Sequence, residues 1–97
     1  MQIVFSLNGV PIRLTDERWE HIIRRHPEIS RYKDKVLEAI TQPDIIQQGE
    51  VGTLLAIKKQ KDKYVVVIYK EISKKDGFII TAYFSERLRR RLILWRH

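Results

Sequence analysis

The chain has 97 residues and no cysteine, which excludes disulfide bonds, a thiolate nucleophile and zinc sites with cysteine ligands. Its 19 lysines and arginines outnumber its 12 aspartates and glutamates, so the formal charge is +7 at pH 7 and a polyanion is the expected partner. It has neither a signal-peptide pattern nor the roughly 20 consecutive apolar residues that a membrane span needs. We therefore expect one cytoplasmic domain over residues 1–97 with no membrane partner.

The first predicted element is a β-hairpin. Ile3 to Phe5 and Val10 to Leu14 flank Asn8-Gly9, a pair that accepts the positive φ angles of a two-residue hairpin turn. These two runs are expected to pair with each other.

A helix is predicted next, with Thr15 as its N-cap and Asp16 and Glu17 in its first turn, where negative charge meets the positive end of the helix dipole. Pro27 disfavours a helical conformation at His26, so the helix should end there. Four residues at helical spacing form one face: Trp19, Ile22, Ile23 and His26. The other side carries Glu17, His21, Arg24 and Arg25.

A second helix is predicted after Ser30, which is a suitable cap, and it ends before Gln42-Pro43. Its apolar stripe is formed by Tyr32 or Lys33 together with Val36, Leu37 and Ile40. Four β-branched and aromatic runs with short turns then predict an antiparallel meander: Ile45-Ile46, Thr53 to Lys58, Tyr64 to Lys70 and Phe78 to Phe84. The last segment, Arg87 to His97, is expected as a helix or an edge strand.

Alternation along the last meander strand predicts which side chains face solvent. Phe78, Ile80, Ala82 and Phe84 are assigned to the core. Thr81 and Tyr83 then share the opposite face, where their hydroxyls are available to a phosphate, and Lys70 ends the neighbouring strand.

Several segments together resemble a known family: Trp19 to Glu28, Gln42 to Asp44, Tyr64 to Lys70 and Gly77 to Tyr83. In order and spacing they look like the phage-associated nuclease family of the barnase, EndoU, colicin and RelE-like superfold. The resemblance covers about Leu14 to Arg87. It implies an α+β fold with two helices on a four-stranded antiparallel sheet, and a metal-independent ribonuclease that often acts as a toxin.

The resemblance also implies a site across the exposed sheet face and the end of the first helix. The family's helix histidines fall on His21 and His26, its arginine on Arg25, and its strand hydroxyl and aromatic residue on Thr81 and Tyr83. Lys70 matches a basic strand position. The strand glutamate that serves as base in barnase has no obvious counterpart here.

RNA cleavage without a metal needs a base for the 2′-hydroxyl proton, an acid for the leaving 5′-oxygen, and cations for the charge on phosphorus. Two histidines with Arg25 and Lys70 supply these functions. No metal or cofactor is expected, because the carboxylates of Asp16, Glu17, Glu20 and Glu28 lie among arginines that repel a cation.

Other interpretations remain open at this point. His26 also suits a core position, His21 a solvated helix surface, and Thr81 and Tyr83 any β-strand. The tail arginines Arg87, Arg89 and Arg90 are expected to bind RNA phosphates, or to form a solvated edge. The alternative functions are a non-catalytic nucleic-acid-binding module and an interaction domain whose basic tail meets an acidic antitoxin or immunity protein.

Overall fold

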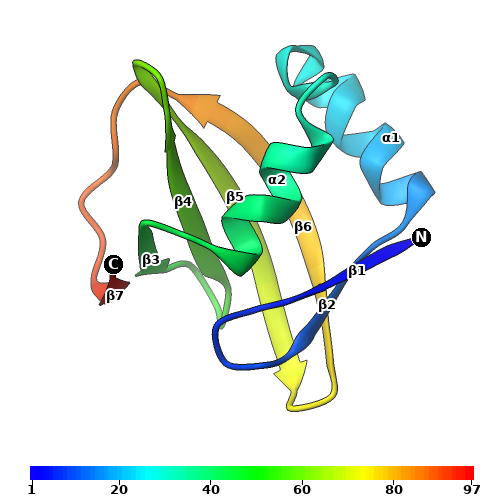
Figure 1. Ribbon diagram of the computed structural model, residues 1–97, viewed down its shortest axis with the longest axis vertical. Coiled ribbons are helices and arrows are strands. Elements are labelled where there is room, and N and C mark those ends of the chain that lie inside the picture. Colours follow the sequence, from blue (N-terminus) through cyan, green and yellow to red (C-terminus); the bar gives the residue numbers. More distant parts are fainter.

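Seven strands form one sheet in the order β1-β2-β6-β5-β4-β3-β7 in the computed structural model, which describes residues 1–97 (Figure 1). All neighbouring strands are antiparallel except β2 and β6, which are parallel. The strands are β1 (Gln2–Phe5), β2 (Pro11–Leu14), β3 (Ile45–Gln48), β4 (Leu54–Gln60), β5 (Lys63–Ser73), β6 (Asp76–Ser85) and β7 (Ile93–Arg96). The helices are α1 (Asp16–Arg25) and α2 (Lys33–Thr41), with a single 3₁₀ turn, η1 (Pro27–Ile29), between them. The fold is therefore α+β, as expected.

The predicted meander is present as β3 to β6, but the sheet has seven strands rather than four. The N-terminal hairpin joins the sheet because Ile12 and Arg13 pair with Gly77 and Phe78. Gly77 permits this close approach, since a Cβ there would lie 2.5 Å from Ile12 Cδ1 and 2.6 Å from the carbonyl oxygen of Lys70.

The hairpin itself is confirmed, with β1 and β2 antiparallel on either side of Asn8-Gly9. Its loop is longer than the expected two-residue turn, because the closing hydrogen bond runs from Ser6 N–H to Val10 O. The loop is tied to β5, where the side chains of Ser6 and Asn8 donate to the two carboxylate oxygens of Glu71.

The first helix begins and ends where the sequence predicts. Thr15 Oγ1 accepts a hydrogen bond from Arg18 N–H at 3.1 Å, and His26 is the C-cap before Pro27. The prediction for the second helix was wrong at its start, since Tyr32 is the N-cap and makes no side-chain capping bond. Ser30 instead closes η1, where its N–H donates to Pro27 O.

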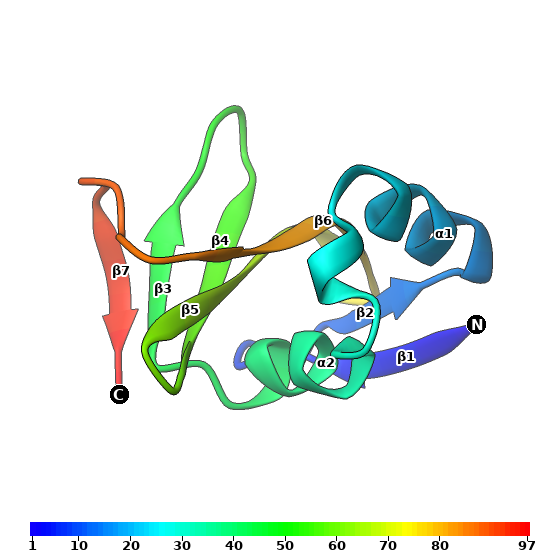
Figure 2. The same ribbon diagram turned by 90° about the horizontal axis from the view of Figure 1, so that it is seen from above.

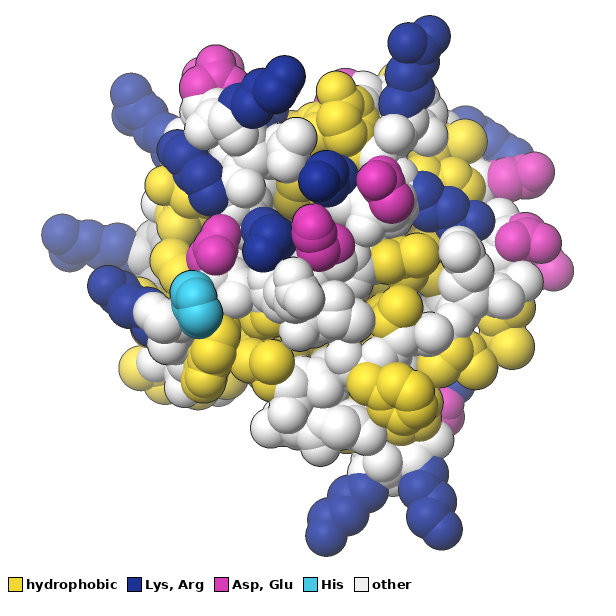
Figure 3. Space-filling model, viewed as in Figure 1, with side chains coloured by type: hydrophobic (Ala, Val, Ile, Leu, Met, Phe, Trp, Pro, Cys, Tyr) yellow, Lys and Arg dark blue, Asp and Glu magenta, His cyan; other side chains and the backbone are white.

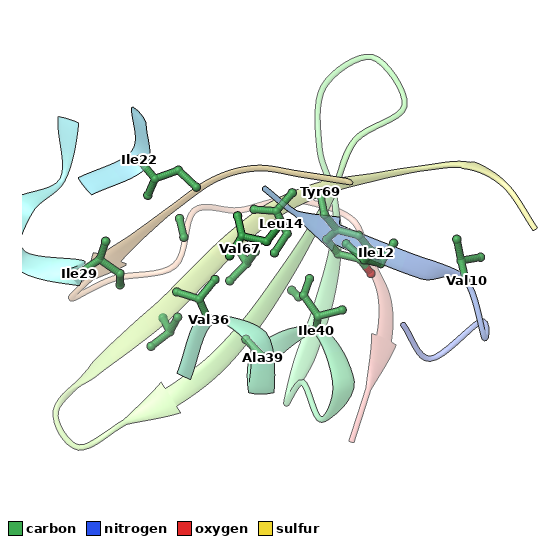
Figure 4. Close-up of a cluster of buried hydrophobic side chains, with 14 residues drawn as sticks. Val10, Ile12, Leu14, Ile22, Ile29, Val36, Ala39, Ile40, Val67 and Tyr69 are labelled. Carbon is green, nitrogen blue, oxygen red and sulfur yellow. The ribbon is translucent and has the colours of Figure 1, made fainter. Parts of the chain in front are cut away.

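The main core lies between the sheet and α2, which crosses one face of the sheet (Figure 1). Figure 4 shows this core, to which β2, α1, η1, α2 and the central strands all contribute. Its largest fully buried side chains include Ile12, Leu14, Ile22, Ile29, Ile40 and Tyr69. Val36 and Ile40 of the predicted stripe are buried, while Leu37 is half-buried.

Alternation fails at one point in β6. Thr81 pairs with Ile68 and Ile79 pairs with Tyr69, so Ile80 is an extra residue that forms a β-bulge. A bulge reverses which side chains face the core, so Ile79 is buried and the assignment of Phe78 and Ile80 to the core was wrong. Beyond the bulge the predicted faces are confirmed, with Ala82 and Phe84 toward the core and Thr81 and Tyr83 away from it.

The C-terminal segment ends as an edge strand, one of the two expected forms. β7 lies antiparallel to β3, and Trp95 stands opposite Ile46. Figure 2 shows β7 at one end of the molecule, with α1 and the hairpin at the other end. Neither α1 nor α2 has the length and hydrophobicity that a membrane-spanning helix requires.

Candidate functional site

The sheet face away from α2, here called the far face, carries a second apolar cluster. Leu55, Ile57 and Val66 are its buried members, and they come from the neighbouring strands β4 and β5. Tyr83 of β6 packs against this cluster, as does Leu88 from the segment that follows β6. The far face is therefore partly covered by the chain's own C-terminal part.

Glu86 to Leu92, here called the arginine segment, is held over the far face by hydrogen bonds at three points, one of which runs from Gln48 N–H of β3 to Leu92 O at 2.8 Å. At the end of β6 the Ser85 hydroxyl accepts from Arg87 N–H and donates to Arg87 O, which turns the chain. Further along, Gln47 Nε2 on β3 donates to Arg89 O at 3.2 Å. Gln47 is only 4% exposed, whereas Arg89 is exposed, so this bond is partly shielded from water.

Between the arginine segment and the far face lies a cleft of about 160 Å³, here called the arginine cleft. The apolar cluster of the far face forms its floor. Its polar lining is made by Gln47, Tyr83, Ser85, Arg87, Arg89 and Arg91. An apolar floor beneath convergent polar groups is an arrangement found in many small-molecule sites.

His26 lies beside this cleft, against one of its lining residues. The centroid of its ring is 5.5 Å from that of Tyr83, with the planes tilted by 34°. On its other side His26 Nδ1 is 3.8 Å from Glu28 Oε2. At 3.8 Å this contact is an ion-pair distance rather than a hydrogen bond, and the half-buried ring keeps contact with solvent.

His21 is exposed and makes no contact with His26 or Tyr83. It borders a shallow hollow with Thr15, Glu17 and Arg18 near the start of α1. His21 precedes His26 by five residues, or about 7.5 Å along a helix axis. The two histidines of the predicted site are thus spaced along α1 rather than paired.

The direction in which His21 and Arg25 point follows from two contacts of α1. Trp19 lies under the Lys33 ammonium of α2, so the Trp19 flank of the helix faces α2. Arg18, about 100° around the helix from Trp19, donates to Ile80 O at the bulge of β6. Arg25 lies about 20° around the helix from Arg18 and shares its direction, whereas His21 lies about 160° around the helix from Trp19 and is exposed.

Thr81 and Lys70 lie further from the cleft. Thr81 shares the far face with Tyr83 and stands opposite Ile68 on β5. Lys70 has the same orientation but is four residues beyond Val66, the partner of Tyr83, which corresponds to about 13 Å along the strand. It is close to the turn at Gly52, where an added Cβ would meet Lys70 Cε at 3.7 Å.

The predicted tail arginines separate into two groups. All three are exposed, but Arg87 and Arg89 line the cleft and Arg90 does not. None of these arginines, nor Arg25, takes part in the ion pairs within the protein, which join Met1 to Asp16, Arg13 to Asp76, His26 to Glu28 and Lys35 to Glu38. Their charges are therefore available to an external anion.

Sequence reasoning missed three residues of this region as site residues: Glu28, Gln47 and Arg91. Glu28 had a signal, because it follows His26-Pro27 directly and a 3₁₀ turn there brings its carboxylate back to the histidine. Gln47 had no such signal. It is a polar residue after the apolar pair Ile45-Ile46, and only its hydrogen bond to the arginine segment explains its place there. Nothing in the run of arginines distinguishes Arg91 from Arg90.

Charge is mixed on the opposite side of the molecule. On the face that carries α2, Lys and Arg side chains project around the outline while Asp and Glu side chains lie among them (Figure 3). No group of three or more His, Asp or Glu side chains lies together in a way that would hold a metal ion. No family model matches the chain, and no curated protein or solved structure matches it either.

Proposed function

We propose that this protein is a metal-independent endoribonuclease that cleaves RNA by attack of a 2′-hydroxyl on the adjacent phosphate. One observation carries the proposal: the ring of His26, with Glu28 at Nδ1, lies against Tyr83 beside a cleft lined by unpaired arginines. The family resemblance of the sequence, found independently of these contacts, supports the same chemistry.

In the proposed reaction His26 takes the proton from the 2′-hydroxyl. The 2′-oxygen forms a bond to phosphorus, the bond from phosphorus to the 5′-oxygen breaks, and the leaving oxygen receives a proton. We assign that donation to His21, the second helix histidine that the family resemblance implies. The products are a 2′,3′-cyclic phosphate and a free 5′-hydroxyl. Glu28 is a positioning residue that orients the His26 ring.

The remaining groups bind or orient the phosphates. Arg25, Arg87 and Arg89 stabilise the additional negative charge that develops on the reacting phosphate. The hydroxyls of Thr81 and Tyr83 orient that group. Lys70 and Arg90, which lie away from the cleft, contact phosphates further along the RNA.

The test is cleavage of a labelled RNA in excess EDTA, with histidine variants compared by initial rate. The wild type should release a 2′,3′-cyclic phosphate product, and His26→Ala should lower the rate by about 10²- to 10⁴-fold. His21→Ala should lower it by about 10²-fold. His97 is the matched control, since its ring is stacked on Trp95 and does not line the arginine cleft, so His97→Ala should retain full activity.

Two outcomes would count against this proposal. Activity that disappears on chelation would mean that the reaction needs a metal. An unchanged rate in His26→Ala, equal to that of His97→Ala, would mean that the imidazole beside Tyr83 takes no part.

Several finer assignments belong to the same proposal. We regard β3 to β6 with α1 as the barnase/RelE-like part of the fold, to which the hairpin and β7 are additions. A toxin-like role in the cytoplasm follows from the resemblance, and an acidic antitoxin or immunity protein would neutralise the arginine segment by covering it.

The second candidate function is RNA or DNA binding without turnover. It is favoured by the unpaired arginines at the cleft, which serve binding equally well with or without catalysis. RNA that is retarded by the protein but stays intact in the cleavage assay would support this function.

A further inference from the structure

The arginine cleft contains a hydrogen-bond donor that the protein itself leaves unused. Arg91 Nε is buried and has no hydrogen-bond partner, and it is the single buried side-chain nitrogen or oxygen of the chain in this condition. A buried donor has lost its water without gaining an acceptor, which is unfavourable and uncommon in folded proteins. An acceptor supplied by a ligand would satisfy it.

The floor of the cleft restricts what that ligand is. Leu55, Ile57 and Val66 form an apolar surface, on which a fully hydrated phosphate would lose water without compensation. A flat ring with polar atoms along its edge would instead cover the floor and offer acceptors to the rim. The volume of about 160 Å³ suits one such ring better than a complete nucleotide.

The rim of the cleft carries cationic side chains that suit the phosphates of a nucleotide. Arg87 and Arg89 lie at the cleft with no carboxylate partner, so their charges are free for the phosphates on either side of a base. Tyr83 joins the cleft to His26, so a base in the cleft would place its neighbouring phosphodiester toward the proposed proton-transfer group.

We propose that the arginine cleft binds one base of a single-stranded RNA and that Arg91 Nε donates a hydrogen bond to a carbonyl oxygen on the edge of that base. RNA as the ligand rests on the proposed function. A base inside a duplex is stacked and paired, so only an unpaired base can enter beneath the arginine segment. Uracil, with two edge carbonyls, is preferred over adenine, which has none.

The experiment measures binding by fluorescence anisotropy with labelled 2′-O-methyl octamers of uridine, of adenosine and of an abasic backbone. These probes lack the 2′-hydroxyl nucleophile, so binding is measured without cleavage. The wild type should bind the uridine octamer about tenfold more tightly than the abasic octamer, and more tightly than the adenosine octamer.

Adjacent arginines provide matched variants. Arg91→Ala should lower affinity for the uridine octamer by about tenfold and leave affinity for the abasic octamer nearly unchanged. Arg91→Lys keeps the charge but removes the Nε donor, so it should lose the preference for uridine over the abasic probe. Arg90→Ala, outside the cleft, should weaken binding of all three probes to the same small extent.

Equal affinity of the wild type for uridine and abasic octamers would overturn the proposal. So would an Arg91→Ala variant that weakens both probes equally, because Arg91 would then contact phosphate only. An Arg91→Lys variant with full uridine preference would exclude the Nε donor. The nuclease proposal fails separately. In that case an RNA with 2′-hydroxyls stays intact in the cleavage assay, while the protein still prefers the uridine octamer in the binding assay.

Discussion

His26 is placed against Tyr83 by the residue that follows it. A proline disfavours helical dihedral angles in the preceding residue, and His26 accordingly has φ −133° and ψ 72°. The chain therefore leaves α1 at the histidine, and its ring reaches the far face instead of continuing along the helix. Pro27 also begins the 3₁₀ turn that returns the Glu28 carboxylate to His26 Nδ1. Two neighbouring residues thus orient the proposed proton-transfer group.

Burial of Tyr69 makes the free energy of unfolding depend on pH. Burial, followed by the negative charge of Glu71, raises the pKa of Tyr69 above the ordinary tyrosine value. The native state therefore keeps this phenol protonated at a pH where the unfolded chain ionises it. The stability that the shift contributes is complete below about pH 10 and is lost as the pH rises above it.

Urea unfolding at pH 8 and pH 11 measures this loss. Tyr69→Phe should show a smaller decrease in the free energy of unfolding than the wild type, by at most about 1.4 kcal/mol per pH unit above 10. Tyr32→Phe, at an exposed phenol, should keep the wild-type pH dependence. Parallel pH dependence in wild type and Tyr69→Phe would contradict the assignment.

At the level of elements, the bulge in β6 decides which side chains are available for chemistry. If Ile80 paired regularly with Ile68 instead of forming a bulge, Thr81 and Tyr83 would lie on the core face with Ile79. With the bulge, both hydroxyl residues point to the far face. Ile80 O at the bulge accepts a hydrogen bond from Arg18 of α1, so the same irregularity also helps to hold the helix beside β6.

Of the two predicted helix caps, Thr15 is present and Ser30 is not, so the two residues form a matched pair for mutation. Thr15→Ala removes the hydroxyl that accepts from Arg18 N–H and should lower the free energy of unfolding by about 1 kcal/mol. Ser30→Ala is the control, since Ser30 is exposed and its side chain caps neither helix, and its effect should stay within about 0.5 kcal/mol. Equal losses in chemical denaturation would mean that the cap does not stabilise α1.

For binding to RNA, the net charge of +7 of the whole molecule matters less than the positions of the arginines that have no carboxylate partner. The few ion pairs use residues near the N-terminus, in the hairpin region, at the end of α1 and within α2. They leave the arginine segment and Arg25 without carboxylate partners on the far-face side. An RNA bound there would exchange its counterions for these arginines.

This distribution predicts how binding depends on salt. For a 2′-O-methyl RNA, the slope of log affinity against log salt concentration should become shallower by about 0.7 for Arg87→Ala and again for Arg89→Ala. Lys75→Ala changes the same charge at the exposed turn between β5 and β6, and should leave the slope unchanged. A slope that responds equally to all three substitutions would indicate diffuse attraction to net charge rather than a defined site.

The sequence by itself determined the hairpin, the span of α1 and the central meander, because caps, turn residues, proline and strand alternation act within a few residues of chain. It also indicated His26, Thr81 and Tyr83 as candidates through spacing and resemblance. Only the tertiary structure decided that β2 joins β6, that Ile80 is an extra residue, and that Glu28, Gln47 and Arg91 belong to the site region. These features depend on contacts between segments far apart in the chain, such as Gln47 with Arg89, and local preferences carry no information about such distant partners.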